Sequence, residues 1–220
     1  MSAFIASFLF VVLAEMGDKT QLLAMAFASR YKARDVLLAV FLATILNHGL
    51  AVLAGHFLAQ TLPLDAIALV ASLSFIFFGL WTIRGDKLDG EDQRETKFGP
   101  IVTVGIAFFL AEMGDKTQLA TISLAVQYQD AVNVLMGTTL GMIVADAIGI
   151  VVGIVLKKHI PEKTVKWFSA TIFVVFGLWG VYDSLSEKLE SLPLGALLLT
   201  LTLLTAVLAR RIVRNEKAHR

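Results

Sequence analysis

Cysteine is absent from this 220-residue chain, and charged residues are scarce, at 17%. The lack of cysteine excludes disulfide bonds, thiolate metal sites, cysteine nucleophiles and S-palmitoylation, and it leaves oxygen and imidazole as the main metal ligands. A net charge of only +1 provides no strong attraction to nucleic acid. Soluble domains are about 45–50% apolar and about 25% charged, whereas this chain is 57% apolar. The composition, with a mean hydropathy of +0.76, therefore favours a protein whose surroundings are a lipid bilayer.

Long apolar runs account for most of the chain. A helix needs about 20 mostly apolar residues to cross about 30 Å of hydrocarbon. Seven stretches satisfy this, at roughly 3–28, 36–60, 65–83, 100–126, 131–156, 166–183 and 193–213. We therefore predict an all-α integral membrane protein with seven spans.

The positive charges indicate how these spans are oriented. Alternate connectors and the C-terminal tail place 16 Lys and Arg residues on one side, and Lys188 alone on the other. Because positive loops stay in the cytoplasm, we predict an outer N-terminus and a cytoplasmic C-terminus. The start MSAFIASF lacks the positive residues of a signal peptide. The short loops and the lack of a targeting segment suggest a bacterial inner membrane.

The chain contains an internal duplication. EMGDKTQ occurs at 15–21 and 112–118, and FIFFGLWTI (75–83) matches FVVFGLWGV (173–181). Three spans in each half would bring the second half in from the opposite face, as in the inverted repeats of many secondary transporters. The expected division is a first three-span repeat (1–83), a charged cytoplasmic linker (84–99), a second repeat (100–183), and an extra transmembrane helix with a basic tail (184–220).

Four acids lie about midway along predicted spans, namely Glu15, Asp18, Glu112 and Asp115. An ionisable group at mid-bilayer costs about 2.5–3.5 kcal/mol on insertion scales. A structural explanation would pair each glutamate with the lysine four residues later, in the favourable order for a helix. That explanation assigns no partner to either aspartate. We therefore predict that the acids have a function.

The spacing of the motif predicts a shared site. Residues three apart lie on one helix face, so the two acids of each copy can point together at the other repeat. The glutamine that ends each motif continues that face, the threonines offer hydroxyl ligands, and the glycines permit close helix approach or a break. These further candidates are Gln21, Gln118, Thr20, Thr117, Gly17 and Gly114.

The chemistry of this cluster favours a hard divalent cation. Carboxylate and amide oxygens without thiolate suit Mg²⁺, Ca²⁺ or Mn²⁺. Four acids with Lys19 and Lys116 carry two net negative charges, which one divalent cation or two protons would neutralise. Crowded carboxylates in a low-dielectric site bind protons more readily. Mutually exclusive binding of metal and protons is the minimum that proton-coupled exchange requires.

The motif E-x-G-D-[KR]-[TS], present once in each half, resembles the signature of the calcium/manganese cation:proton antiporter family, to which the bacterial MneA-type manganese exporters belong. The resemblance covers about residues 1–183, and both copies match in full. It implies secondary active export of Mn²⁺ or Ca²⁺ in exchange for protons, with the acids as ligands. The seventh span departs from the usual six-span plan. The resemblance marks Glu15, Gly17, Asp18, Lys19 and Thr20, then Glu112, Gly114, Asp115, Lys116 and Thr117.

Two further polar residues, His48 and Asp146, occupy matched positions in the second and fifth spans. They could form a proton relay or an outer ligand layer, or they could simply make polar contacts between helices. Two other function classes stay open: an intramembrane aspartyl enzyme in which Asp18 and Asp115 share a proton, and a divalent-cation channel. We expect a transporter without enzymatic activity or a resident cofactor, and leave homo-oligomerisation open.

Overall fold

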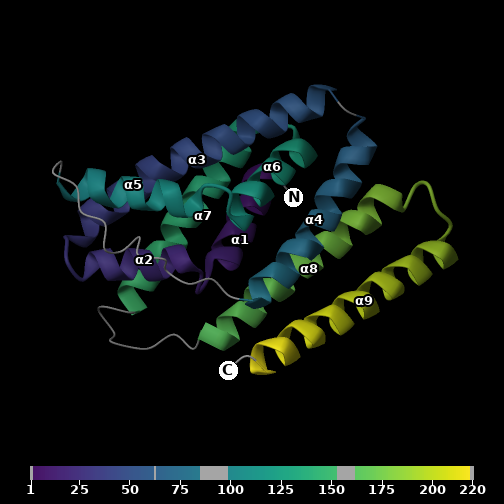
Figure 1. Cartoon of the computed structure of the whole chain (residues 1–220). Helices are drawn as coiled ribbons and strands as arrows, with labels where there is room; N and C mark the ends of the chain where they lie inside the picture. Colours follow the sequence, from purple (N-terminus) through teal and green to yellow (C-terminus); the bar gives the residue numbers. More distant parts are fainter. Residues whose placement is uncertain (1, 62, 85–98, 153–161, 219–220) are drawn as a thin grey trace.

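The computed structural model describes residues 2–61, 63–84, 99–152 and 162–218, which form nine α-helices and no strand (Figure 1). The all-helical prediction is therefore confirmed for this part of the chain. The helices are α1 (Ala3–Glu15), α2 (Lys19–Ala28), α3 (Ala33–Thr61), α4 (Leu64–Arg84), α5 (Pro100–Glu112), α6 (Lys116–Tyr128), α7 (Ala131–Ile150), α8 (Glu162–Leu185) and α9 (Ser191–Ala218).

Four of these helices contain a segment long and apolar enough to cross a membrane: Ala33–Thr61, Ala131–Ile150, Trp167–Leu185 and Ser191–Arg214. The first and fourth predicted spans differ from expectation, because each consists of two shorter helices, α1–α2 and α5–α6. A helix of 13 residues, the length of α1, rises only about 20 Å at 1.5 Å per residue, which is less than the hydrocarbon thickness. The count of seven spans stays a prediction.

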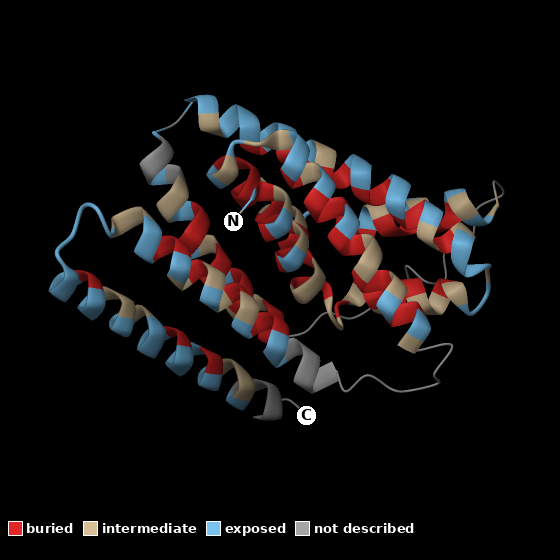
Figure 2. Ribbon diagram, turned by 180° about the vertical axis from the view of Figure 1, so that it is seen from behind, coloured by how far each residue is buried: buried red, intermediate tan, exposed pale blue. Residues whose placement is uncertain are grey.

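The outer surface of the bundle is rich in large apolar side chains. Exposed side chains include Phe57 (70%), Trp179 (68%) and Leu53 (66%). Figure 2 shows buried residues along the faces where helices meet and exposed residues on the outward faces. Large contiguous apolar surface is rare on soluble monomers, so the helices present to their surroundings the surface that lipid solvates.

The helices of the two halves interleave. The pair α1–α2 packs along α7, the pair α5–α6 packs along α3, and α4 packs against α8. Each broken segment therefore lies beside the long unbroken helix of the other half. This arrangement brings the two copies of EMGDKTQ toward the middle of the bundle.

Two glycines at equivalent positions allow α4 and α8 to pack closely. A Cβ built at Gly79 would lie 2.9 Å from the carbonyl oxygen of Ala170, and one built at Gly177 would lie 2.7 Å from that of Ser72. Small residues at such crossings let helix backbones approach one another within a membrane. The FGLW sequence that recurs in both halves thus has a packing role.

Gly177→Ala tests this contact. Its methyl group would lie 2.6 Å from Cγ1 of Ile76 and 2.7 Å from the carbonyl oxygen of Ser72, so α4 and α8 would have to separate. Overpacking of this kind costs about 1–3 kcal/mol. We expect a lower Tm for the detergent-purified protein, followed by circular dichroism. Gly195→Ala in α9 is the matched control, since nothing lies within 4 Å of a Cβ there; equal Tm values for the two variants would contradict the close packing.

Candidate metal-binding site

Both copies of the motif break their helix at the same place. The first copy ends α1 at Glu15 and begins α2 at Lys19, and the second does the same between α5 and α6. Gly17 and Gly114 have φ values of 74° and 78°, a left-handed conformation that glycine adopts without a steric penalty. Each glutamate is therefore the last residue of one helix, and the aspartate three residues later occupies the N-cap position of the next without a side-chain capping hydrogen bond. The two acids of a copy lie on either side of a break rather than along one continuous helical face.

The glutamine of each motif stabilises the break. The amide nitrogen of Gly17 donates to Oε1 of Gln21 at 2.7 Å, and that of Gly114 donates to Oε1 of Gln118 at 2.7 Å. These side chains replace a main-chain partner that the interrupted helix no longer supplies. In both copies, the glutamine four residues after the glycine accepts the hydrogen bond of that glycine's amide.

The other end of each glutamine ties the break to the opposite half. Nε2 of Gln21 donates to the carbonyl oxygen of Ala145 at 2.6 Å, while Nε2 of Gln118 faces Asn47, 3.3 Å from its Oδ1. Ala145 and Asn47 occupy equivalent positions in α7 and α3. Because both polar ends of these glutamines are engaged, their assignment as metal ligands stays a prediction that would require these bonds to open.

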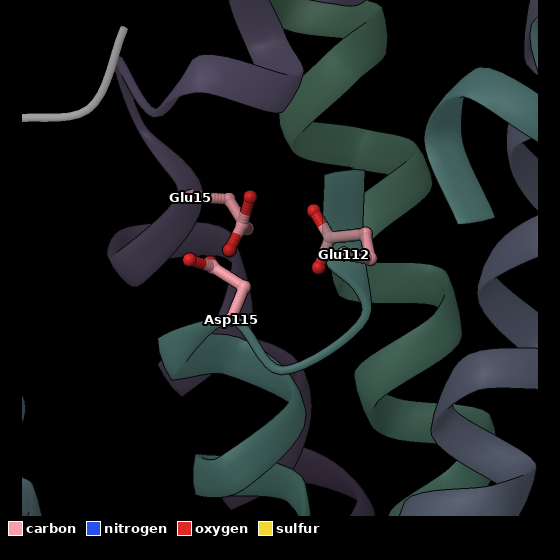
Figure 3. Close-up of side chains that lie close together, drawn as sticks. All are labelled: Glu15, Glu112 and Asp115. Atoms are coloured by element: carbon pink, nitrogen blue, oxygen red, sulfur yellow. The ribbon is translucent and has the colours of Figure 1, made fainter. Parts of the chain in front are cut away.

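Three carboxylates from the two copies meet in the interior. One carboxylate oxygen from each of Glu15, Glu112 and Asp115 lies within 4.8 Å of the other two, and all three residues are buried. Figure 3 shows Glu15 approaching from α1, Glu112 from the end of α5, and Asp115 from the break before α6. Three convergent carboxylates form a site that could hold a metal ion. The fourth predicted acid, Asp18, is not part of this group.

The lysines form ion pairs across the two copies. Nζ of Lys116 bonds to Asp18 of the first copy, and Nζ of Lys19 lies 3.7 Å from Asp115 of the second. Lys116 also lies 3.8 Å from Asp115. The structure thus shows ion pairs between the two motifs. The structural explanation in the sequence analysis instead paired each glutamate with the lysine of its own motif. Since two lysines offset two aspartates, the two negative charges that remain are those of the glutamates.

The two glutamates have unequal surroundings. Thr20 donates to Glu15 at 2.8 Å, and Thr117 of the other copy donates to the second oxygen of Glu15. Within the described part of the chain, neither oxygen of Glu112 has a hydrogen-bond partner, although the residue is only 1% exposed. A buried carboxylate without a partner is costly unless a cation or a proton neutralises it. Glu112 therefore has unused capacity to bind an ion.

His48 and Asp146 are fully buried in α3 and α7. Among the described residues, their ring nitrogens and carboxylate oxygens have no hydrogen-bond partner. They lie outside the group of three carboxylates. The described residues around His48 and Asp146 therefore do not provide the polar contacts between helices that were the alternative to a functional role. A role in proton transfer stays a prediction.

The sequence analysis missed Ser169, which contacts the first break. Its hydroxyl donates to the carbonyl oxygens of Leu13 at 3.2 Å and Met16 at 3.1 Å. A lone serine in an apolar helix carries no recognisable signal, because most such hydroxyls bond within their own helix. Only the packing of α8 against α1 shows that this one does not.

Comparison with known proteins identifies the family. Residues 3–90 and 100–188 match the family model described as divalent cation/proton antiporter GDT1. The chain belongs to the GDT1 family. A Vibrio cholerae protein, provisionally named a manganese exporter, is 43% identical over 180 residues, covering 81% of this chain and 90% of its own length. A GDT1-like protein from Synechocystis is 32% identical over 199 residues, covering 81% of this chain and 96% of its own. No solved structure matches the chain.

Membership of the GDT1 family makes the chain a divalent-cation transporter of the membrane and not an enzyme. This result excludes the intramembrane aspartyl enzyme that the paired aspartates left open. It also confirms the resemblance drawn from the doubled motif. Together with the apolar helices, it identifies an integral membrane protein.

Glu112→Gln tests the carboxylate group. Glutamine has nearly the same shape, and Glu112 accepts no hydrogen bond that the change would lose, so the fold should persist. We expect Mn²⁺ affinity, measured by titration calorimetry on the purified protein, to fall at least about tenfold, equivalent to about 1.4 kcal/mol. Glu187→Gln, at an exposed position, is the control. Unchanged Mn²⁺ binding in the folded Glu112 variant would show that the ion lies elsewhere.

Proposed function

We propose that this GDT1-family chain is a secondary active exporter that moves divalent cations, Mn²⁺ or Ca²⁺, out of the cytoplasm in exchange for protons. The observation that carries the proposal is the buried group of Glu15, Glu112 and Asp115, built from both copies of the motif. Oxygen ligands of this kind suit hard divalent cations. The name of the Vibrio cholerae relative favours Mn²⁺ as the first ion to test.

The charges explain why metal and protons would exclude each other. Once the two lysines are paired with the two aspartates, Glu15 and Glu112 hold two negative charges in an apolar interior. One divalent cation neutralises them, and so do two protons. Binding both would leave an uncompensated positive charge in a low-dielectric site, which is strongly unfavourable.

The helix breaks favour a cation at the same place. Glu15 and Glu112 are the last residues of α1 and α5, and the C-terminal end of a helix carries partial negative charge. Asp18 and Asp115 lie at the N-cap positions of α2 and α6, where the helix dipole stabilises negative charge. Broken helices with ions at their ends recur in secondary transporters.

The crossed contacts support an inverted-repeat carrier. Each lysine pairs with the aspartate of the other copy, and each glutamine reaches the long helix of the other half. We propose that the two halves enter from opposite faces, with the site between them near the middle of the membrane. The N-terminus would then lie outside and the C-terminus in the cytoplasm, in a bacterial inner membrane. The ions are cargo, and no resident cofactor is proposed.

Transport in inside-out vesicles tests the coupling. We expect Mn²⁺ uptake driven by an acidic interior, followed with a manganese-sensitive dye, and abolished when a protonophore collapses the gradient. Glu15→Gln and Asp115→Asn should insert normally and lose uptake. Uptake that persists at full rate without the gradient would favour the channel instead, and Ca²⁺ in place of Mn²⁺ would establish the ion preference.

Lys19→Ala tests whether this lysine tunes the site. Its Nζ lies 3.7 Å from Asp115, so removing its positive charge lets the carboxylates bind protons more readily. We expect the pH at which uptake is half-maximal to move upward, because a lower proton concentration then suffices to displace the metal. Lys32→Ala, at an exposed position, should leave the pH profile unchanged. Identical profiles for both variants would separate Lys19 from the site.

A further inference from the structure

The α4–α8 pair lies on one side of the carboxylate group. In the described part of the chain, α4 packs against α6 and α8 packs against α1. Among the residues that the structure describes, the equivalent contacts of the other half, between α8 and α2 and between α4 and α5, are at most marginal. Figure 1 shows α4 and α8 beside α1 and α6, with α2 and α5 farther away. Two halves of similar sequence are therefore packed unequally.

Ser169 joins α8 to the first helix break. Its hydroxyl donates to the carbonyl oxygens of Leu13 and Met16, which belong to the end of α1, where the interrupted helix leaves carbonyls without their usual partners. Ser169 is only 2% exposed. The equivalent position in α4 is Ala71, which has no hydroxyl. A matching bond from α4 to the second break cannot form.

Aromatic packing shows the same inequality. The ring of Phe10 in α1 lies edge-on to Phe75, Phe173 and Phe176, with centroid separations of 5.0, 5.0 and 4.9 Å. Phe75 and Phe173 are equivalent residues of α4 and α8, whereas the equivalent of Phe10 in α5 is Ala107. Ala107 has no ring to make the same contact, so the aromatic cluster joins the α4–α8 pair to α1 and has no counterpart at this position of α5.

The two copies of the motif also differ in burial and in hydrogen bonding. The side chain of Lys19, at the start of α2, is 18% exposed, while that of Lys116, at the start of α6, is 1% exposed. Both threonine hydroxyls of the site serve the glutamate at the end of α1. The lysine at the start of α6, where α4 packs, is therefore more enclosed than its counterpart at the start of α2.

We propose that Ser169 is a positioning residue of the transport cycle. Its hydroxyl holds α8, and α4 with it, against α1 and α6, and the protein exchanges with a second state in which the pair lies against α2 and α5. This inference rests on the proposed function, because a carrier needs two such states and duplicated halves provide two places for the pair. In the proposed topology α1 and α6 lie toward the outside, so the state described here opens toward the cytoplasm and is ready to load metal.

Distance measurements between spin labels test this proposal. The absence of cysteine lets two introduced cysteines carry nitroxides without background. One pair, Gln129 with Ser186, reports on the ends of α6 and α8, and the other, Ser29 with Thr171, reports on α2 and α8. In Ser169→Ala we expect the first distance to lengthen and the second to shorten. Loss of one buried hydrogen bond predicts a change of about fivefold in the ratio of the two states.

Two variants control for general disruption. Ala71→Ser places a hydroxyl in α4 that would meet the second break only in the proposed second state, so it should favour that state and shift both distances in the same direction as Ser169→Ala. Ser184→Ala removes a hydroxyl that bonds Gly180 at 2.7 Å within α8 itself, and both distances should stay unchanged. Unshifted distances in folded Ser169→Ala would overturn the proposal. If Ser169→Ala does not fold, unshifted distances in Ala71→Ser would overturn it instead. An equal shift in Ser184→Ala would also overturn it.

The outcome is separable from that of the transport assay. The distances are measured on purified protein in lipid nanodiscs and need no ion gradient. Shifted distances in a protein that moves no Mn²⁺ would reject the proposed function and leave the positioning role of Ser169 standing. Proton-coupled uptake by a protein whose distances do not respond would reject the positioning role alone.

Discussion

Negative charge in an apolar interior is the constraint on which this structure depends. Carboxylates at mid-membrane are tolerated only if other groups neutralise them, and the two motifs meet this need by exchanging partners. Lys116 serves Asp18, and Lys19 lies beside Asp115. Each motif carries one net negative charge, and the ion pairs of Lys116 with Asp18 and of Lys19 with Asp115 form only because the two halves lie together. The glutamates keep the charge that remains, and a transported ion or protons can neutralise it.

The helix breaks place main-chain ends beside the candidate metal site. An unbroken helix would place all its main-chain groups in hydrogen bonds and leave only side chains to meet an ion. Positive φ at Gly17 and Gly114 divides the α1–α2 and α5–α6 segments, so that helix ends meet in the interior. The glutamines then satisfy the exposed amides, which makes a break in an apolar environment tolerable. The most polar part of the molecule is thereby placed at its centre.

Similar halves in unequal surroundings are what a two-state carrier requires. A perfectly symmetric molecule would have no preferred side, whereas this chain has Phe10 and Ser169 where the other half has Ala107 and Ala71. These two differences lie at helix contacts rather than in the motifs. The two motifs therefore keep the same residues, while the packing around them places α4 and α8 against α1 and α6.

The sequence alone determined the membrane class and the family, because long apolar runs and a doubled acidic motif have few physical explanations. It also indicated the acids among which the structure finds the buried group of Glu15, Glu112 and Asp115. The tertiary structure decided which lysine meets which aspartate, because helical spacing describes neighbours within one helix and the true partners lie about a hundred residues away. It likewise decided that Glu15 is hydrogen-bonded while Glu112 is not: identical sequences differ only through what the rest of the fold packs around them.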